Sequence, residues 1–311
     1  MSANVSLRKL YLHFQENCPR SNWKIYVDSF FFQCKVNNLT EKTLQVYAER
    51  LFYFARHLSE KGIDVDNVTK RTIQEYVVHL QEKVSDATVN GRIRVFRCFW
   101  NHLCEEELWD KPNPCNKMKL IREEFRIKPI VSPEQYVEVL KKIDKSTFEG
   151  FRNYLMMMVF WDAMIRRVEL LSLLTENVDL QSGTLKVYGK GRKERWVPVG
   201  PKTLGVLRKY LVNHRNKIGG EVLFCSKIGK GLEADYVQKL VSRFGKRSGV
   251  KLYPHLIRHS AATNFIRNGG SSAVLQKVLG HTSIVITEKY MHLRDSDACQ
   301  LYQSQSIGLA L

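Results

Sequence analysis

Apolar side chains recur at intervals of three and four residues through the first third of the chain, a spacing that places them on one face of a helix. Thr40 precedes the clearest run, and its hydroxyl can accept a hydrogen bond from a free backbone NH at a helix start. Thr69, or alternatively Thr72, can cap the next run in the same way. The pattern predicts helices over Thr43–Leu58, Thr72–Lys83 and Ala87–Glu106.

The third of these helices is expected to have two unlike faces. The side expected to be buried carries Val89, Ile93, Phe96, Trp100 and Leu103. The opposite side carries Arg92, Arg94 and Arg97. Guanidinium groups on an exposed helix face can contact phosphates or base edges in a DNA groove. A plain solvated helix surface is the equally open alternative.

Farther along the chain the period of the pattern changes. Leu185, Val187 and Tyr188 precede a glycine-containing turn, and Arg195 to Val197 follow it, which predicts a β-hairpin. Helical spacing predicts the other elements of this half at Pro133–Ile143, Phe151–Ala163, Val168–Leu174, Thr203–His214, Ala234–Ser248, Arg258–Asn268 and Ser272–Leu279. The expected fold class is mainly α with a small β hairpin or sheet.

Prolines and charged residues mark a boundary between the two halves. Pro112, Pro114, Pro129 and Pro133 surround a strongly charged stretch, a composition typical of a linker. The sequence therefore predicts an N-terminal extension (1–21), a helical domain (22–120), a linker (121–132), a second domain (133–295) and a C-terminal tail (296–311) suited to docking on another protomer.

The charge balance narrows the choice of partner. Lys and Arg total 49 against 31 Asp and Glu, a formal charge of +18, which favours a polyanion. No stretch approaches the ~20 apolar residues that span a bilayer, so nucleic acid is preferred to a membrane. Seven scattered cysteines without metal-ligand spacing favour reduced cytoplasmic thiols and no structural metal.

The second half also contains the groups that attack on a phosphodiester requires. These are a nucleophile, cationic donors for the phosphate oxygens and a proton for the leaving oxygen. The motifs follow in order as RRVELL from Arg166, GKGRKER from Gly189, HLIRH from His255, LGH ending at His281, and Tyr290.

Taken together, these motifs resemble the catalytic domain of the tyrosine recombinase/integrase family. The TLQVY and TVNGRIRVF segments resemble the family's core-binding domain, so the likeness covers roughly residues 22–295. It implies a two-domain architecture, with a helical core-binding domain followed by a mixed α+β catalytic domain. It further implies double-stranded DNA as the partner, and a homo-tetramer on two DNA sites.

The resemblance also implies the reaction. Tyr290 would attack a DNA phosphate and form a 3′-phosphotyrosyl link, while Lys190 protonates the leaving 5′ oxygen. Because the covalent link conserves the bond energy, neither a cofactor nor a metal is required. Arg192 and Lys193 would contact the DNA beside the hairpin turn.

The remaining groups of the site would bind the phosphate. Arg166, Arg258 and His281 are expected to donate to its oxygens. His255, one helical turn before Arg258, would accept the tyrosine proton or bind an oxygen. Glu169 would support the pocket without reacting.

Several points stay open. Arg167 competes with Arg166, although the three-residue spacing of Arg166 and Glu169 puts those two on one helical face. Lys193 competes with Lys190. Met164 stands where the family commonly has a small residue, often Gly, which puts the aim of Arg166 in question. For the whole protein, type IB topoisomerase-like relaxation and DNA binding without catalysis are the alternatives.

Overall fold

The computed structural model describes residues 8, 12, 22–123, 129–189 and 194–280, and it divides into two compact units. Unit 1 is Met1–Arg126 and unit 2 is Ile127–Leu311. The predicted C-terminal tail lies outside the described residues, as does the predicted N-terminal extension apart from Arg8 and Leu12. No helix in the described part of the chain is both long enough and apolar enough to cross a bilayer.

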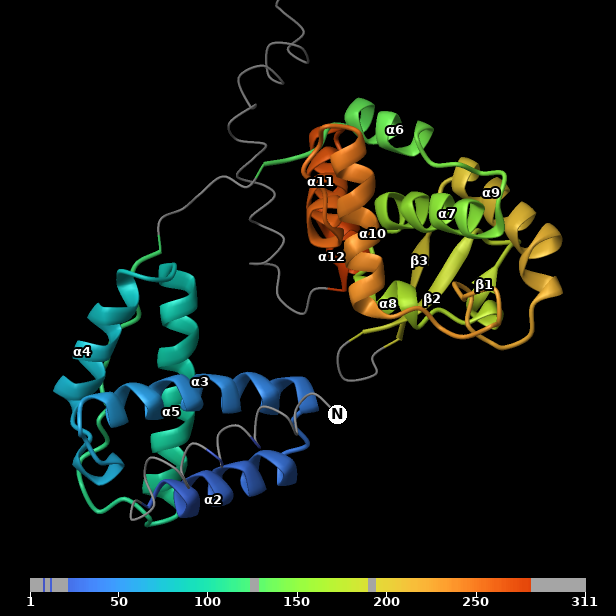
Figure 1. Ribbon diagram of the computed structural model, residues 1–311. Coiled ribbons are helices and arrows are strands. Elements are labelled where there is room, and N and C mark those ends of the chain that lie inside the picture. Colours follow the sequence, from blue (N-terminus) through green and yellow to red (C-terminus); the bar gives the residue numbers. More distant parts are fainter. Residues whose placement is uncertain (1–7, 9–11, 13–21, 124–128, 190–193, 281–311) are drawn as a thin grey trace, which may run out of the picture. The chain divides into compact units, whose positions relative to one another are not determined.

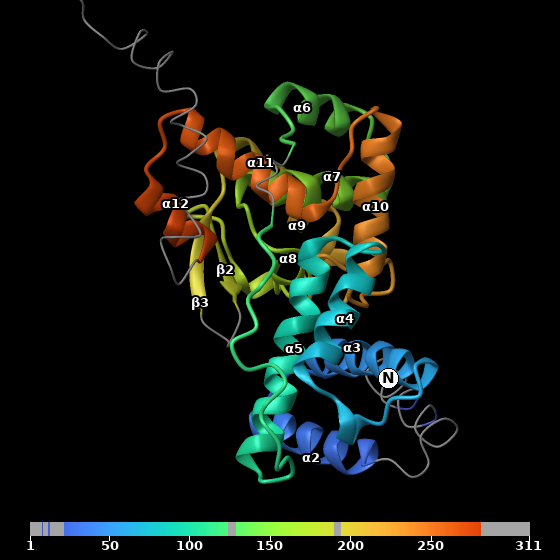
Figure 2. The same ribbon diagram turned by 90° about the vertical axis from the view of Figure 1, so that its left-hand side faces the viewer.

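The described part of unit 1 is built from helices, and α5 (Asp86–Glu105) contacts α2, α3 and α4 (Figures 1 and 2). Its main elements are α2 (Trp23–Val36), α3 (Glu41–Glu60), α4 (Lys70–Gln81) and α5 (Asp86–Glu105), with a 3-10 turn at Val65–Asn67. The hydroxyls of Thr40 and Thr69 accept hydrogen bonds from the backbone NH groups of Thr43 and Thr72. Both predicted helix caps are therefore confirmed.

Aromatic rings fill the core of unit 1. Phe54 of α3 packs on Phe96 and Trp100 of α5, with ring centroids 4.7 and 5.8 Å away. Trp23 of α2 stacks on Phe99 at 6.0 Å. All five apolar side chains predicted for the buried face of α5 are buried, so burial of that stripe holds the helices together.

Unit 2 is built around the buried helix α7 (Phe148–Asp162), which packs against α6, α8, α9 and α11. Three antiparallel strands form its sheet, in the order β1-β2-β3 (Figure 1). The predicted hairpin is confirmed as β2 (Thr184–Tyr188) and β3 (Glu194–Pro198), whereas β1 (Val178–Asp179) was not predicted. The remaining helices are α6 (Pro133–Lys141), α8 (Arg167–Leu171), α9 (Pro201–Asn213), α10 (Ala234–Arg247), α11 (Pro254–Arg267) and α12 (Ser272–Leu279).

Three predicted helix boundaries in unit 2 are wrong by three or more residues. Helix α7 begins at Phe148, three residues before the predicted start at Phe151. Helix α11 begins at Pro254, four residues before the predicted start at Arg258. Proline favours the first helical position because its φ is already helical and its missing NH would have no partner there. Helix α8 ends at Leu171 and not at Leu174, because the next residues turn into a 3-10 segment at Thr175–Asn177.

Two helical glycines give opposite predictions for the same substitution. A Cβ added at Gly245 of α10 would lie 2.4 Å from the Val250 carbonyl oxygen and 2.5 Å from Leu252 Cβ. At Gly205 of α9, no atom of the described residues lies within 4 Å of the added carbon. Gly245→Ala should therefore destabilise unit 2 by about 2 kcal/mol, whereas Gly205→Ala should stabilise it by about 1 kcal/mol.

Urea unfolding of the two variants and the wild type measures both changes. Equal effects of the two substitutions would contradict the close approach of the Val250–Leu252 loop to α10. The close approach also helps to place α11, because this loop leads directly into that helix.

Candidate active site

Four of the predicted site residues lie in the described part of unit 2, namely Arg166, Glu169, His255 and Arg258. The other predicted site residues of this unit fall outside the described residues: Lys190, Arg192, Lys193, His281 and Tyr290.

Glu169 is the centre of the described part of the site. It lies in α8 and only 3% of its side chain is exposed. Its Oε2 accepts a hydrogen bond from the Arg166 backbone NH, and its Oε1 accepts one from Arg166 Nη1, both at 2.8 Å. Arg166 is the extended residue just before α8 and Glu169 is the third residue of that helix. The two side chains therefore meet as the spacing predicts, but across the start of the helix and not along one helical face.

Arg167 points to a different element. Its Nη1 donates to the Ala234 carbonyl oxygen at 3.0 Å and to Gln238 Oε1 at 3.3 Å, both on α10. The geometry therefore favours Arg166 over Arg167 as the donor beside Glu169.

Two further guanidinium groups lie near the same carboxylate. Arg195 of β3 donates from Nη1 to Glu169 Oε1 at 3.0 Å and from Nη2 to Oε2 at 2.8 Å. Arg258 Nη1 lies 3.9 Å from Oε2. Three guanidinium groups around one carboxylate leave an excess of two positive charges, which suits an anionic phosphate.

The pKa of Glu169 reflects these partners. Burial alone would raise it, but the hydrogen bonds from the Arg195 guanidinium and the Arg166 backbone NH outweigh burial and lower the pKa to about 2. Glu169 therefore stays charged at neutral pH and cannot act as a proton donor there.

Arg258 is buried, with 7% of its side chain exposed. Its Nη1 donates to the Met164 carbonyl oxygen at 2.7 Å, and its Nη2 donates to the Leu279 carbonyl oxygen at 2.8 Å. Arg258 thus ties α11 to the turn before Arg166 and to the end of α12. These bonds fix the direction of its guanidinium plane.

The backbone of Met164 shows how a methionine is accommodated where the family commonly has a small residue. Its φ is 49°, in the left-handed region, which glycine adopts without strain and other residues adopt at a cost of roughly 1 kcal/mol. The Met164 side chain is buried beside α11 and α12. The backbone at Met164 therefore makes the turn that glycine favours. The carbonyl oxygen of Met164 is the one that Arg258 binds.

The two histidines of the HLIRH motif lie in the first turns of α11. His255 is exposed and comes one turn before the buried Arg258, while His259 is half-buried. His255 therefore lies on the exposed side of the first turn of α11.

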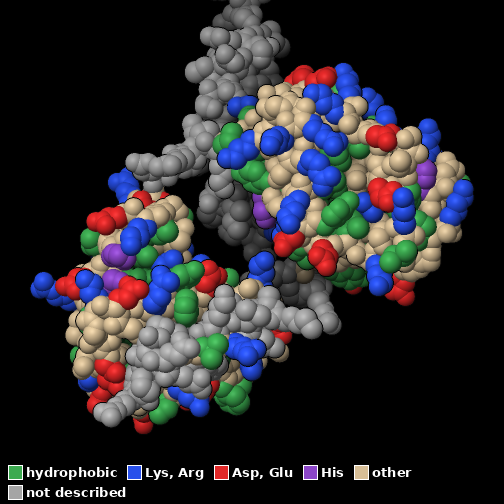
Figure 3. Space-filling view, in the orientation of Figure 1, with side chains coloured by type: hydrophobic (Ala, Val, Ile, Leu, Met, Phe, Trp, Pro, Cys, Tyr) green, Lys and Arg blue, Asp and Glu red, His purple; other side chains and the backbone are tan. Residues whose placement is uncertain are grey.

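Helix α10 and the loop after it form a basic surface, which we call the α10 surface. Its exposed cations are Lys239, Arg243, Lys246, Arg247 and Lys251. Figure 3 shows Lys and Arg side chains gathered over this part of unit 2. None of these residues was predicted as a site residue. Their only signal in the sequence is that they alternate with the buried positions of α10, which indicates an exposed helix face and no particular function.

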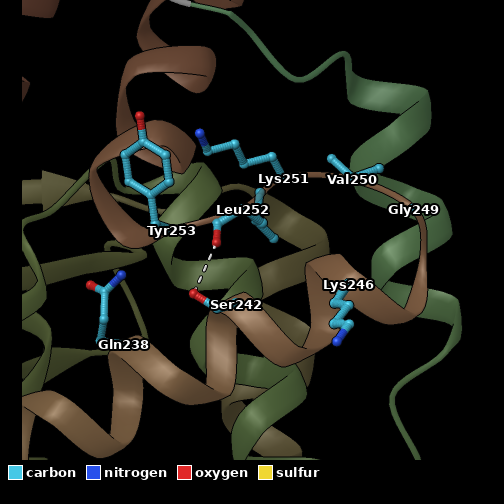
Figure 4. Close-up of a pocket in the computed structure, with 8 residues that line it drawn as sticks. All are labelled: Gln238, Ser242, Lys246, Gly249, Val250, Lys251, Leu252 and Tyr253. Atoms are coloured by element: carbon cyan, nitrogen blue, oxygen red, sulfur yellow. Dashed lines mark hydrogen bonds between the residues drawn. The ribbon is translucent and has the colours of Figure 1, made fainter.

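An open pocket of about 470 Å³ lies on the α10 surface (Figure 4). Ser242 donates to the Leu252 carbonyl oxygen at 3.3 Å and so ties α10 to the loop. The pocket is lined by Gln238, Ser242, Lys246, Lys251, Leu252 and Tyr253, among others. Lys246, Lys251 and Gln238 contribute the charged and amide groups of its lining, and such groups can contact a phosphate backbone.

The predicted basic face of α5 in unit 1 is only partly exposed. Arg94 is exposed, but Arg92 is half-buried and donates to the Tyr76 hydroxyl at 2.8 Å. Arg97 is also half-buried and donates to the Met118 carbonyl oxygen. Of the three, Arg94 has the most accessible guanidinium.

Metal ligands do not gather in the described ranges. No group of three or more His, Cys, Asp or Glu side chains among these residues could hold a metal ion.

The low pKa of Glu169 makes the stability of unit 2 depend on pH. The folded-state pKa of about 2 lies below the 4.5 of a free glutamate, so the charge stabilises the fold above pH 4.5. As the pH falls from about 5 to about 3, wild type should lose about 2 kcal/mol of stability from this group. Glu169→Gln should be less stable at neutral pH and should lack this loss.

Urea unfolding across this pH range, followed by hydrogen exchange of α8 and α11, measures the difference within unit 2. Parallel pH curves for wild type and Glu169→Gln would contradict the assignment.

Two family models match the chain. Residues 130–297 match the model described as Phage integrase family, and residues 27–110 match the model of the phage integrase N-terminal SAM-like domain. Tyrosine recombinase XerD of Staphylococcus haemolyticus is 28% identical over 272 residues, which cover 85% of this chain and 92% of that protein. XerD of Staphylococcus aureus strain N315 is 29% identical with the same coverage.

Solved structures share the fold. XerH site-specific recombinase, in a post-cleavage complex with palindromic difH substrate, matches with a TM-score of 0.73 and 21% identity over 98% of this chain and 96% of that one. A lambda integrase dimer bound to a COC′ core site matches with a TM-score of 0.68 and 16% identity over 85% of this chain and 96% of that one. Because the Phage integrase model alone spans more than half of the sequence, this chain belongs to the phage integrase family, the family of the tyrosine recombinases.

Proposed function

We propose that this protein is a site-specific DNA recombinase that cuts and rejoins DNA strands through a 3′-phosphotyrosyl intermediate. The observation that carries the proposal is the set of three guanidinium groups around buried Glu169, within the unit that matches the integrase family. Such a set provides the excess positive charge that a phosphodiester under attack needs.

The arginines would bind the scissile phosphate. Arg166 is the most open of the three guanidinium groups, with 38% of its side chain exposed. It can present the planar pair of donors that matches two non-bridging oxygens. Arg258 would add donors from a direction that the Met164 and Leu279 carbonyl oxygens fix.

Tyr290 would supply the nucleophile. Its phenolic oxygen attacks phosphorus, the bond to the 5′ oxygen breaks, and a 3′-phosphotyrosyl bond replaces it. The Tyr290 proton goes to the exposed imidazole of His255, and Lys190 gives a proton to the departing 5′ oxygen. His281 donates to a phosphate oxygen. A 5′ hydroxyl of a partner strand then reverses the step.

DNA would lie against the basic surfaces of both units. The formal charge of +18 supports this, as do the α10 surface and exposed Arg94. Arg192 and Lys193 would contact the backbone beside the hairpin turn, with Arg92 and Arg97 as further candidates on α5. The XerH and lambda integrase structures that share the fold are themselves complexes with DNA.

The domains would have separate tasks in an assembly. Residues 22–120 would form the core-binding domain and 133–295 the catalytic domain, joined by a linker at 121–132. Four protomers would act on two DNA sites, since strand exchange between two duplexes needs four cleavages. The C-terminal tail, 296–311, would dock on a neighbouring protomer.

A nicked duplex tests the nucleophile directly. A nick close to the cleavage position lets a short fragment diffuse away, so the covalent adduct accumulates. With a duplex that the protein binds, wild type should form an adduct on a denaturing gel, and Tyr290→Phe should lower its yield by about 1000-fold or more. DNA affinity should stay unchanged because only a hydroxyl is removed.

An adduct that persists in Tyr290→Phe would reject Tyr290 as the nucleophile. A wild-type protein that binds the duplex and forms no adduct would reject the enzymatic function and favour DNA binding without catalysis.

The α10 surface can be tested by salt dependence. Each phosphate contact releases counterions, so Lys246→Gln or Lys251→Gln should reduce the slope of log affinity against log salt concentration by about 1. Lys227→Gln is the matched control, because Lys227 is not one of the residues of this surface and pairs with Glu149 at 3.0 Å. Fluorescence anisotropy measures the affinities, and equal slopes in all three variants would contradict the DNA-binding role.

A further inference from the structure

Arg195 is the second of the guanidinium groups around Glu169, and protein atoms surround it. Its two terminal nitrogens donate to the two carboxylate oxygens of Glu169 at 3.0 and 2.8 Å. Its Nε donates to the Val278 carbonyl oxygen at 2.9 Å. Only 13% of the side chain is exposed. All three guanidinium nitrogens therefore bind protein atoms, which leaves Arg195 a poor candidate for a direct phosphate donor.

The two partner residues of Arg195 come from distant parts of the chain. Glu169 is 26 residues before Arg195, and Val278 is 83 residues after it. Arg195 itself lies on β3, the strand that follows the turn with Lys190. One side chain thus joins the hairpin, the start of α8 and the end of α12.

The contact with α12 continues to the last described residue. Gly280 ends α12 with φ 63°, and a Cβ added there would lie 3.0 Å from Arg195 Cδ and 3.1 Å from Cζ. The side chain of Arg195 therefore packs directly beside the Gly280 backbone. Arg258 binds the neighbouring carbonyl oxygen of Leu279 at 2.8 Å. Two arginines hold successive carbonyl groups immediately before the sequence continues into His281.

Arg195 also determines how Glu169 meets Arg166. A forked guanidinium that binds both oxygens of a carboxylate fixes the plane of that carboxylate. The Oε1 atom that Arg195 holds is the same atom that accepts the bond from Arg166 Nη1. The direction of the Arg166 guanidinium therefore depends on the fork between Arg195 and Glu169.

We propose that Arg195 is a positioning residue for strand cleavage, which orients Arg166 through Glu169 and sets the end of α12 through Val278. The proposal rests on the proposed recombinase function. Arg195 makes the positions of the hairpin, the phosphate-binding arginine and the segment that leads to His281 depend on one another. Displacement of a catalytic group by about 1 Å can slow a reaction by about 100-fold.

Arg195→Lys is the decisive variant because it keeps the positive charge but cannot form the fork and the third bond together. With the nicked duplex, it should bind DNA as wild type does but form the covalent adduct about 100-fold more slowly in single turnover. Arg195→Gln, which also loses the charge, should be slower still. A faster adduct rate in Arg195→Lys than in Arg195→Gln would show that the residue does more than fill space.

Glu194→Gln provides a matched control on the same strand. Successive side chains of a strand point to opposite faces, and Glu194 pairs with Lys186 at 2.7 Å on the exposed face. Its loss removes a solvent-exposed ion pair, which contributes little. Adduct formation by this variant should stay within about threefold of wild type.

A double variant tests the route through Glu169. If Arg195 acts through Glu169, adding Arg195→Lys to Glu169→Gln should slow the reaction far less than it slows wild type. Multiplied effects of the two substitutions would overturn the proposal, and so would an unchanged adduct rate in Arg195→Lys.

Thermal unfolding completes the test. Loss of folded structure in Arg195→Lys would also overturn the proposal, because the residue would then serve the fold alone. Wild type that binds but forms no adduct would reject the recombinase function itself. A normal wild type beside a normal Arg195→Lys rejects only the role of Arg195.

Discussion

The buried carboxylate of Glu169 is the constraint on which unit 2 depends. An ionised group with 3% exposure is costly unless charged donors surround it. Here the cationic partners are Arg166 just before α8, Arg195 on β3 and Arg258 on α11, which are separate in sequence. These contacts make Glu169 a shared partner of three segments. Compensation of its buried charge and assembly of the cationic site therefore depend on the same residues.

Backbone carbonyl oxygens accept further hydrogen bonds from the two buried arginines, Arg195 and Arg258. Val278 and Leu279 end α12, where the last carbonyl groups have no helical partner and carry a partial negative charge. Arg195 and Arg258 bind these two carbonyl groups and so also cap the helix. Met164, whose backbone is in the left-handed conformation, supplies a third carbonyl oxygen to Arg258. The strain at Met164 is thus coupled to the position of a catalytic candidate.

Local rules explain why much of this was predictable from the sequence. The caps at Thr40 and Thr69 and the hairpin depend on neighbouring residues, and the pairing of Arg166 with Glu169 depends on a three-residue spacing across the start of α8. Long-range contacts leave no such local pattern in the sequence. Nothing within β3 reveals that Arg195 binds a carboxylate 26 residues away. Nor could the helical pattern of α5 show that Arg92 and Arg97 bind Tyr76 and Met118. Segments whose structure is not described, including Tyr290, rest on motif order alone.

The exposure of the three arginines indicates where the excess charge is available. Arg195 and Arg258 have 13% and 7% of their side chains exposed, against 38% for Arg166. The two buried guanidinium groups face protein oxygens, so the unbalanced positive charge is accessible mainly on the side of Arg166. An anion that binds there neutralises positive charge that Glu169 alone does not neutralise. Because this balance is set before substrate arrives, little reorganisation is needed when charge develops on the phosphate.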